Sequence, residues 1–164
     1  MPRTLITPID DEESGRLAVG VWQAARRAAG NLPSEARSER VAAKVARGAE
    51  AGEVALLAHY GERAAGMLVA EPFQDEDGPD DACGHLSMVF VDPALWGCGV
   101  ASALMRSLQR GDHGPGWTRL SVWTRATNLR AQRLYRARGF TDTGERATLH
   151  EGEVISRWEW RAGG

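Results

Sequence analysis

Apolar and polar positions follow two different periods along this chain, and the two periods separate expected helices from expected strands. In four segments, apolar residues recur at every third or fourth position, which is typical of a helix with one buried side. The expected helices span residues 11–29, 33–52, 96–110 and 126–139. Other segments alternate between apolar and polar residues or form short apolar runs, as β-strands do. The expected strands span residues 3–9, 54–60, 63–71, 84–92, 119–124, 140–144 and 153–160.

The resulting order, βααβββαβαββ, predicts an α/β (α+β) domain in which helices pack on a mixed sheet. Local signals support individual boundaries. Asp10 or Asp11 is suited to cap the first helix, because a short carboxylate side chain can accept hydrogen bonds from the first free amides. Gly61 and Glu62 separate two apolar runs and therefore predict the turn of an antiparallel hairpin.

Length and composition point to one domain. A chain of 164 residues, 43% hydrophobic and 26% charged, is long enough for one core and short for two. We expect a single domain over residues 1–164, with an acidic loop at 74–82 and a short disordered tail at 162–164. The net charge of −2 gives no electrostatic reason to expect nucleic acid or an anionic membrane as the main partner.

The two cysteines and the N-terminus indicate a soluble, cytoplasmic protein. Cys83 and Cys98 do not form a CxxC pair, and no further ligands complete a metal-binding pattern, so we expect no metal. The N-terminal segment turns acidic where a signal peptide would need its apolar centre. The uninterrupted apolar runs are far shorter than the roughly 20 residues that a membrane-spanning helix needs.

Two glycines, Gly97 and Gly99, directly precede the third expected helix. Unpaired amides and the helix dipole at such a place suit a phosphate, although a tight turn before a helix would use the same residues. A Walker loop is excluded, because the only lysine, Lys44, lies elsewhere. A dinucleotide-binding fingerprint fits poorly, since Ser102 stands where it needs a small Gly or Ala.

Two longer segments carry a family resemblance. LSMVFVDPALWGCGVASALM resembles motif A of the GNAT superfamily of acetyl-CoA-dependent N-acyltransferases, a strand ending in V-x-P followed by Q/R-x-x-G-x-G/A. Gly99 and Ala101 match this motif, whereas Trp96 stands where the family usually has Gln or Arg. TNLRAQRLYRARGF resembles motif B, N-x-x-A-x-x-L-Y-x-x-x-G-F, at every fixed position. The matching residues are Asn128, Ala131, Leu134, Tyr135, Gly139 and Phe140.

The resemblance implies a GNAT-like fold, a mostly antiparallel central sheet with one parallel, splayed strand pair, flanked by helices. It also implies an N-acetyltransferase that moves an acetyl group from acetyl-CoA to an amine by direct transfer in a ternary complex. The residues that it assigns to the cofactor are Val89, Phe90, Val91, Trp96, Gly97, Cys98, Gly99, Val100, Ala101, Ser102, Asn128 and Tyr135. Residues 89–91 fit a plain core strand equally well.

Three residues are candidates for the chemistry that this resemblance implies. Tyr135 would protonate the departing thiolate as the general acid; alternatively, it caps the core. His85 lies eleven residues before Trp96, where one branch of the family has its base, and is the candidate general base; alternatively, it bonds a nearby loop. Ser87 would position a water. Cys98 could in principle carry the acetyl group, but direct transfer is preferred.

The acceptor is an amino group of a small molecule or of a protein or peptide. The resemblance places its cleft between residues 30–40 and 145–152. Residues suited to line it are Asn31, Ser34, Glu35, His150 and Glu151. Trp158 and Trp160 are expected in the core or in a homodimer interface rather than around a substrate. The alternative function is a non-catalytic acyl-CoA-binding or sensing domain, which the missing Gln or Arg at Trp96 would favour.

Overall fold

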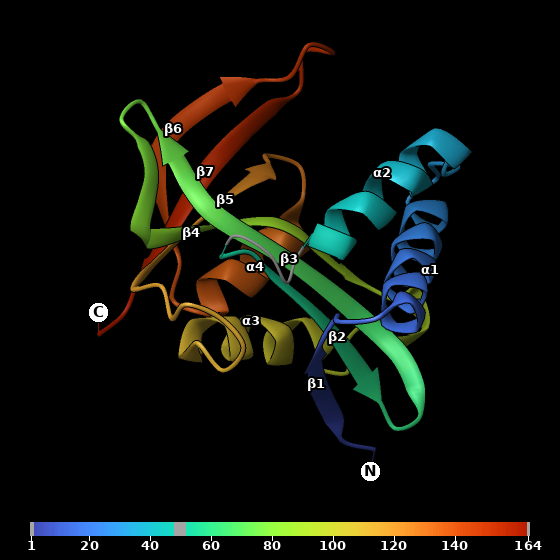
Figure 1. The fold of residues 1–164 in the computed structure, drawn as a ribbon. Helices are drawn as coiled ribbons and strands as arrows, with labels where there is room; N and C mark the ends of the chain where they lie inside the picture. Colours follow the sequence, from blue (N-terminus) through green and yellow to red (C-terminus); the bar gives the residue numbers. More distant parts are fainter. Residues whose placement is uncertain (1, 48–51, 164) are drawn as a thin grey trace.

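The computed structural model describes residues 2–47 and 52–163 as a seven-stranded sheet flanked by helices (Figure 1). The strands are β1 (Thr4–Pro8), β2 (Val54–Tyr60), β3 (Arg63–Asp75), β4 (Gly78–Val91), β5 (Arg119–Arg125), β6 (Thr141–Thr148) and β7 (Val154–Arg161). The helices are α1 (Glu12–Ala28), α2 (Glu35–Ala46), the short 3-10 helix η2 (Pro93–Leu95), α3 (Val100–Arg110) and α4 (Leu129–Ala137). Apart from η2, this order is the one that the sequence periods predict.

The strands lie in the order β1-β2-β3-β4-β5-β7-β6. Every neighbouring pair is antiparallel except β4 and β5, which are parallel. The predicted fold class, a mostly antiparallel sheet with one parallel pair, is therefore confirmed. The parallel pairing is short, since it joins Cys83–Leu86 of β4 to Arg119–Val122 of β5 and does not continue beyond Leu86.

A β-bulge lies where β4 and β5 separate. Val69 of β3 pairs with Met88, but the next residue, Ala70, pairs with Leu86, so Ser87 is the extra residue on β4. A bulge bends its strand and increases the local twist. Beyond Ser87, β4 therefore keeps β3 as a neighbour on one side and is open on the other.

Each face of the sheet carries its own core. On one face, α3 and α4 cover a cluster that includes Leu68, Leu104 and Tyr135. On the other face, Val21 of α1 and Val45 of α2 pack on Met67 and the residues around it. Figure 1 shows α1 and α2 lying side by side. The helices explain why the middle strands are buried on both sides and read as continuous apolar runs.

The predicted acidic loop at 74–82 is wrong. β3 continues to Asp75 and β4 begins at Gly78, so the two strands form a long hairpin with its turn between them. Backbone pairing does not require apolar side chains, and the carboxylates here cap free amides. Asp75 accepts a hydrogen bond from the Asp77 amide at 2.8 Å, and Asp80 accepts one from the Ala82 amide at 2.9 Å.

Several predicted boundaries shift. α2 ends at Ala46 instead of near residue 52, and residues 48–51 lie outside the described residues. α3 begins at Val100 instead of residue 96, because Gly97 and Gly99 have φ angles of +81° and +82°, outside the right-handed helical range. β6 continues to Thr148, beyond the predicted end at residue 144.

Other local predictions are confirmed or corrected at the two ends of the chain. The Asp11 side chain caps α1, accepting from the Ser14 amide at 2.7 Å. Trp158 is 2% exposed and belongs to the core. In the predicted disordered tail, the Ala162 amide donates to the Thr118 carbonyl at 2.8 Å, and residue 164 lies outside the described residues. Within 2–47 and 52–163, no helix is both long and apolar enough to cross a membrane.

Candidate active site

The turn before α3 exposes a row of backbone amides. The Ala103 amide is the first to bond back along the helix, to the Gly99 carbonyl at 3.0 Å, so the amides at the start of the helix lack helical partners, whereas the Cys98 amide bonds the Leu95 carbonyl at 3.2 Å. A Cβ atom added at Gly97 or Gly99 would meet nothing within 4 Å, so the turn is open on its outer side. Neither α3 nor α4 has an acidic residue in its first turn. The geometry fits a bound pyrophosphate, which helix dipole and free amides would stabilise.

Trp96 connects this turn to two other elements. Its indole N–H donates to the carbonyl of Val91, at the end of β4, at 3.1 Å. The guanidinium carbon of Arg130, in the first turn of α4, lies 3.7 Å from the centre of the indole ring. The ring is 42% exposed. Trp96 was identified from the sequence as the departure from motif A, but nothing in the sequence indicated that Arg130 would lie on it.

The open edge of β4 begins after Ser87. The Asp92 amide donates to the Ala65 carbonyl of β3 at 2.8 Å, and antiparallel pairing alternates along a strand. Phe90 therefore directs its backbone groups toward β3, whereas Val89 and Val91 direct theirs to the other side, where the Val91 carbonyl accepts from the Trp96 indole. Their side chains divide in the same way: Val89 and Val91 pack on the α3–α4 core, and Phe90 packs on the α1–α2 core.

Tyr135 of α4 lies on the α3–α4 face of the sheet, where the side chains of Val89 and Val91 also pack. Its side chain is 4% exposed, and its ring centre lies 5.6 Å from that of Phe140. Burial raises the pKa of the Tyr135 phenol well above its usual range, so the hydroxyl stays protonated at neutral pH. Asn128, predicted to contact the cofactor, uses its side-chain oxygen to cap α4, accepting from the Ala131 amide at 3.1 Å.

His85 and Ser87 lie on the opposite face of the sheet, together with a carboxylate that the sequence did not single out. His85 pairs across the strands with Glu71 of β3. The Ser87 hydroxyl donates to Glu71 Oε1 at 2.8 Å, and the ammonium of Lys44, from α2, donates to the same oxygen at 3.5 Å. These four polar side chains, His85, Ser87, Glu71 and Lys44, form what we call the β3–β4 polar cluster.

Two pKa shifts favour a neutral histidine beside an ionised carboxylate. Burial lowers the pKa of the His85 imidazole, and the charges of Lys44 and Arg157 act in the same direction, whereas Glu71 opposes them. Burial works against ionisation of Glu71, but the Ser87 hydroxyl and the Lys44 ammonium outweigh it and lower its pKa. His85 Nδ1 is buried without a hydrogen-bond partner among the described residues. Its ring centre lies 5.9 Å from that of Phe73 of β3, with the two rings tilted.

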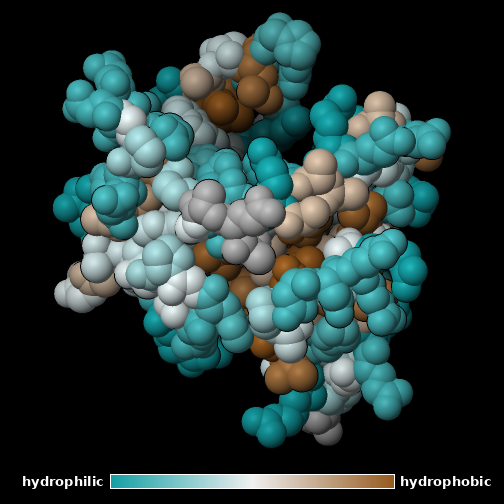
Figure 2. Space-filling view, in the orientation of Figure 1, coloured by the Kyte–Doolittle hydropathy of each residue, from teal (hydrophilic) through white to brown (hydrophobic). Residues whose placement is uncertain are grey.

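Arg157 of β7 extends the polar face toward β5 and β6. It bonds the Ser121 hydroxyl at 3.3 Å and pairs with Glu145 and with Glu159. Its guanidinium carbon lies 5.6 Å from the centre of the Phe73 ring. Figure 2 shows a notch in the outline of the molecule between the β6–β7 end of the sheet and α2.

Of the predicted acceptor-lining residues, Ser34 serves as the N-cap of α2, with its hydroxyl accepting from the Arg37 amide at 3.1 Å. His150 is almost completely exposed and lies 3.2 Å from Glu151. The structure brings neither of them into the β3–β4 polar cluster.

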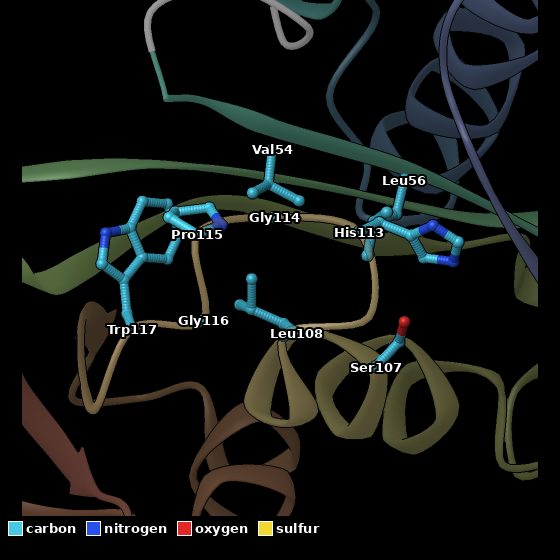
Figure 3. A pocket seen from close by; sticks show the side chains of 10 residues that line it. Val54, Leu56, Ser107, Leu108, His113, Gly114, Pro115, Gly116 and Trp117 are labelled. Carbon is cyan, nitrogen blue, oxygen red and sulfur yellow. The ribbon is translucent and has the colours of Figure 1, made fainter.

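Two hollows lie elsewhere. A cavity of about 10 Å³ lies between β2 and the α3–β5 connection, where Ser107 Oγ is buried without a partner among the described residues (Figure 3). It has room for about one water and none for a substrate. A hollow of about 650 Å³ lies between α1 and α2, lined by Asp11, Arg16 and Ala42 among others.

The comparisons with known proteins agree with this geometry. The family model described as Acetyltransferase (GNAT) family matches residues 21–140. No curated protein matches the chain. Among solved structures, a putative GNAT acetyltransferase from Desulfovibrio desulfuricans has a TM-score of 0.77 at 13% identity, over 97% of this chain and 99% of that one.

Two further structures are similar over almost the whole chain. The ribosomal-protein-S18-alanine N-acetyltransferase of Escherichia coli has a TM-score of 0.69 at 16% identity, over 97% of this chain and 94% of that one. A putative acetyltransferase from Salmonella typhimurium, solved with acetyl-CoA, has a TM-score of 0.68 at 19% identity, over 96% and 93%. At these identities the likeness shows the fold, and the family model shows the membership: the chain belongs to the GNAT family and is an N-acetyltransferase.

Proposed function

We propose that this protein transfers the acetyl group of acetyl-CoA directly to an amino group of a small molecule, or of a protein or peptide, within a ternary complex. One observation carries the proposal. The Ser87 bulge and the end of the β4–β5 pairing leave an opening in the sheet. The α3–α4 face of the sheet carries Tyr135 and the side chains of Val89 and Val91. The opposite face carries the β3–β4 polar cluster.

The cofactor would enter from the α3–α4 side. Its pyrophosphate would bind the amides of Gly97 and of residues 99–102, and its pantetheine arm would lie along the backbone groups of Val89 and the Val91 amide as an added strand does, since the Val91 carbonyl accepts from Trp96. Phe90 would contribute only through its side chain on the other face. The Salmonella structure, which contains acetyl-CoA, supports this choice of cofactor.

The acceptor would reach the opening from the polar cluster. An amine attacks only when it is unprotonated, so an acceptor that arrives as an ammonium must lose a proton. His85, held neutral by burial, is available to take that proton directly or through a water that Ser87 helps to hold. Glu71 is ionised and is suited to bind the ammonium beforehand through its second oxygen, since Lys44 and Ser87 both donate to Oε1.

The transfer then needs one more proton. The amine nitrogen bonds to the acetyl carbon, the carbon–sulfur bond breaks, and the CoA thiolate leaves. A phenol has an ordinary pKa of about 10 and a thiol one of about 8.5, so the phenol is the weaker acid; Tyr135 would therefore give its proton to the sulfur while the carbon–sulfur bond breaks, and would recover a proton from solvent afterwards. Burial raises the pKa of the Tyr135 phenol, so its hydroxyl carries the proton at neutral pH before the transfer begins.

The similar solved structures include a ribosomal-protein-S18-alanine N-acetyltransferase and a putative phosphinothricin N-acetyltransferase. An acceptor screen should therefore contain peptide N-termini as well as small amines and amino acids. A cytoplasmic location belongs to the same proposal and is supported by the two free thiols, Cys83 and Cys98.

The test follows release of the CoA thiol from acetyl-CoA with each member of this screen. Turnover on at least one amine, lost in Tyr135→Phe, is expected. Tight acetyl-CoA binding without turnover on any amine would instead favour the acyl-CoA sensor, the function that the missing motif A side chain at Trp96 would suggest. Cys98 is exposed, and a Cys98→Ala variant that keeps its turnover is expected from direct transfer.

A further inference from the structure

We propose that Arg130, held against the indole of Trp96, binds the pyrophosphate of acetyl-CoA in place of the side chain that motif A normally supplies at position 96. The inference rests on the proposed function, because it assigns a residue to the cofactor of that function. It concerns Trp96, which departs from the motif, and Arg130 of α4, which lies on top of it.

Two contacts determine where the Arg130 guanidinium lies. Trp96 is held by the bond from its indole N–H to the Val91 carbonyl at 3.1 Å, so the ring has a defined place beside Gly97. Arg130 stacks on that ring at 3.7 Å, and α4 supports the base of its side chain. A guanidinium that stacks through its flat face keeps the N–H donors on its edge available.

The surroundings of Arg130 leave its charge unneutralised. Within the part of the chain that the structure describes, no ion pair joins Arg130 to a carboxylate, and neither α3 nor α4 has an acid in its first turn. Other arginines near the site do have acidic partners, such as Arg125 with Glu153 at 2.6 Å and Arg63 with Asp92 at 2.7 Å. A cation in the first turn of a helix is unfavourable because it faces the positive end of the dipole. A bound anion would reverse that effect.

The choice of pyrophosphate follows from the place of Trp96. Gly97 follows Trp96 directly and begins the turn before α3, in which, among the described residues, only the Cys98 amide is bonded, to the Leu95 carbonyl at 3.2 Å, so the guanidinium lies on the residue next to the unpaired amides. Arginine binds phosphate oxygens with two parallel hydrogen bonds, and the amides can hold the remaining oxygens. Trp96 acts in this arrangement as a positioning residue, and Arg130 makes the contact.

Isothermal titration calorimetry of acetyl-CoA with the wild-type protein and with Arg130→Ala tests the proposal. We expect the dissociation constant to rise about tenfold in Arg130→Ala, the size typical of losing a hydrogen bond to a charged group. The matched control is Arg110→Ala, which removes the same charge at the far end of α3, where Arg110 pairs with Asp112 at 3.0 Å. That variant should bind within about twofold of wild type, since its charge lies several turns from the amides.

Truncated ligands separate the phosphate groups. The loss in Arg130→Ala should persist with S-acetyl-3′-dephospho-CoA and disappear with S-acetylpantetheine, which lacks the pyrophosphate. A loss that disappears already with the dephospho ligand would assign Arg130 to the 3′-phosphate and overturn the proposal. Thermal unfolding of each variant without ligand shows whether it is folded.

Placing glutamine at position 96, as motif A has it, provides an independent test. In a Trp96→Gln background, Arg130→Ala should cost clearly less than tenfold, because glutamine at 96 then supplies a phosphate contact of its own. Wild-type affinity in Arg130→Ala would refute the role of Arg130 while leaving the acetyltransferase proposal intact. If the wild-type protein binds no acetyl-CoA, both proposals fail.

Discussion

Replacing Tyr135 by phenylalanine removes one oxygen from the place where the thiolate would leave. The ring is 4% exposed and packs 5.6 Å from Phe140, and phenylalanine preserves both contacts. The folded protein should therefore lose little stability, on the order of 1 kcal/mol. General acids contribute about 10²- to 10⁴-fold to rate, so kcat should fall by at least about a hundredfold, or about 2.7 kcal/mol of barrier. The hydroxyl acts only when the thiolate departs, so the KM for acetyl-CoA should stay within about twofold.

The assay is steady-state thiol release over a range of acetyl-CoA concentrations, with the amine saturating. The chain offers a matched control, because its only other tyrosine, Tyr60, is a half-buried residue of β2 on the same core. Tyr60→Phe should keep kcat within about twofold. A Tyr135→Phe enzyme with kcat within about threefold of wild type would refute the assignment of the general acid and would require water to protonate the thiolate.

Three further predictions concern the polar cluster and the sheet beneath it. His85→Gln should lower kcat/KM by about a hundredfold and remove the acidic limb of its pH profile. In the wild type this limb lies below about pH 6.5, because burial lowers the His85 pKa. An unchanged limb excludes His85 as the base. Glu71→Gln should raise the KM for the amine about tenfold and leave that for acetyl-CoA unchanged, and equal effects on both would contradict ammonium binding. Gly84→Ala should destabilise the fold by about 1 to 3 kcal/mol, because its Cβ would lie 2.2 Å from the Trp117 ring. Chemical unfolding measures this loss. An unchanged denaturant midpoint would show that the ring moves freely.

Burial of His85 also makes stability depend on pH. The folded state holds the pKa of His85 below the ordinary unfolded value of about 6.5, so below that pH the unfolded chain binds the proton more readily. Acidification therefore lowers the free energy of unfolding. This contribution should be absent from His85→Gln.

Local sequence patterns predicted which helices and strands form, whereas pairing between distant residues decided how far some strands extend. Helix and strand periods, the Asp11 cap and the two motifs depend on residues close in sequence, and the structure confirms the elements that they predict. The hairpin at 74–82 could not be recognised in the same way, because its strands are stabilised by backbone pairing between polar residues. The start of α3 shifted because two glycine φ angles, which a helical period does not reveal, keep the turn open.

The site was predicted only in part for the same reason. His85, Ser87 and Tyr135 lie on motif positions and could be named, but their partners come from other elements. Glu71 reaches Ser87 through the β3–β4 register, and Arg130 reaches Trp96 through the packing of α4 beside α3. The turn at Gly61 predicts the pairing of β2 with β3, whereas the turn between Asp75 and Gly78 does not predict which residues face Glu71, because the β3–β4 register shifts between Pro72 and Phe73 and again at Ser87.

The most direct test of the account is a crystal structure of the protein with acetyl-CoA. We expect the pantetheine arm along Val89 and Val91 and the thioester at the opening after Leu86. The Tyr135 hydroxyl should lie within hydrogen-bond distance of the thioester sulfur, with Glu71 and His85 across the sheet. A cofactor bound away from the β4–β5 opening, or a thioester out of reach of Tyr135, would contradict the account.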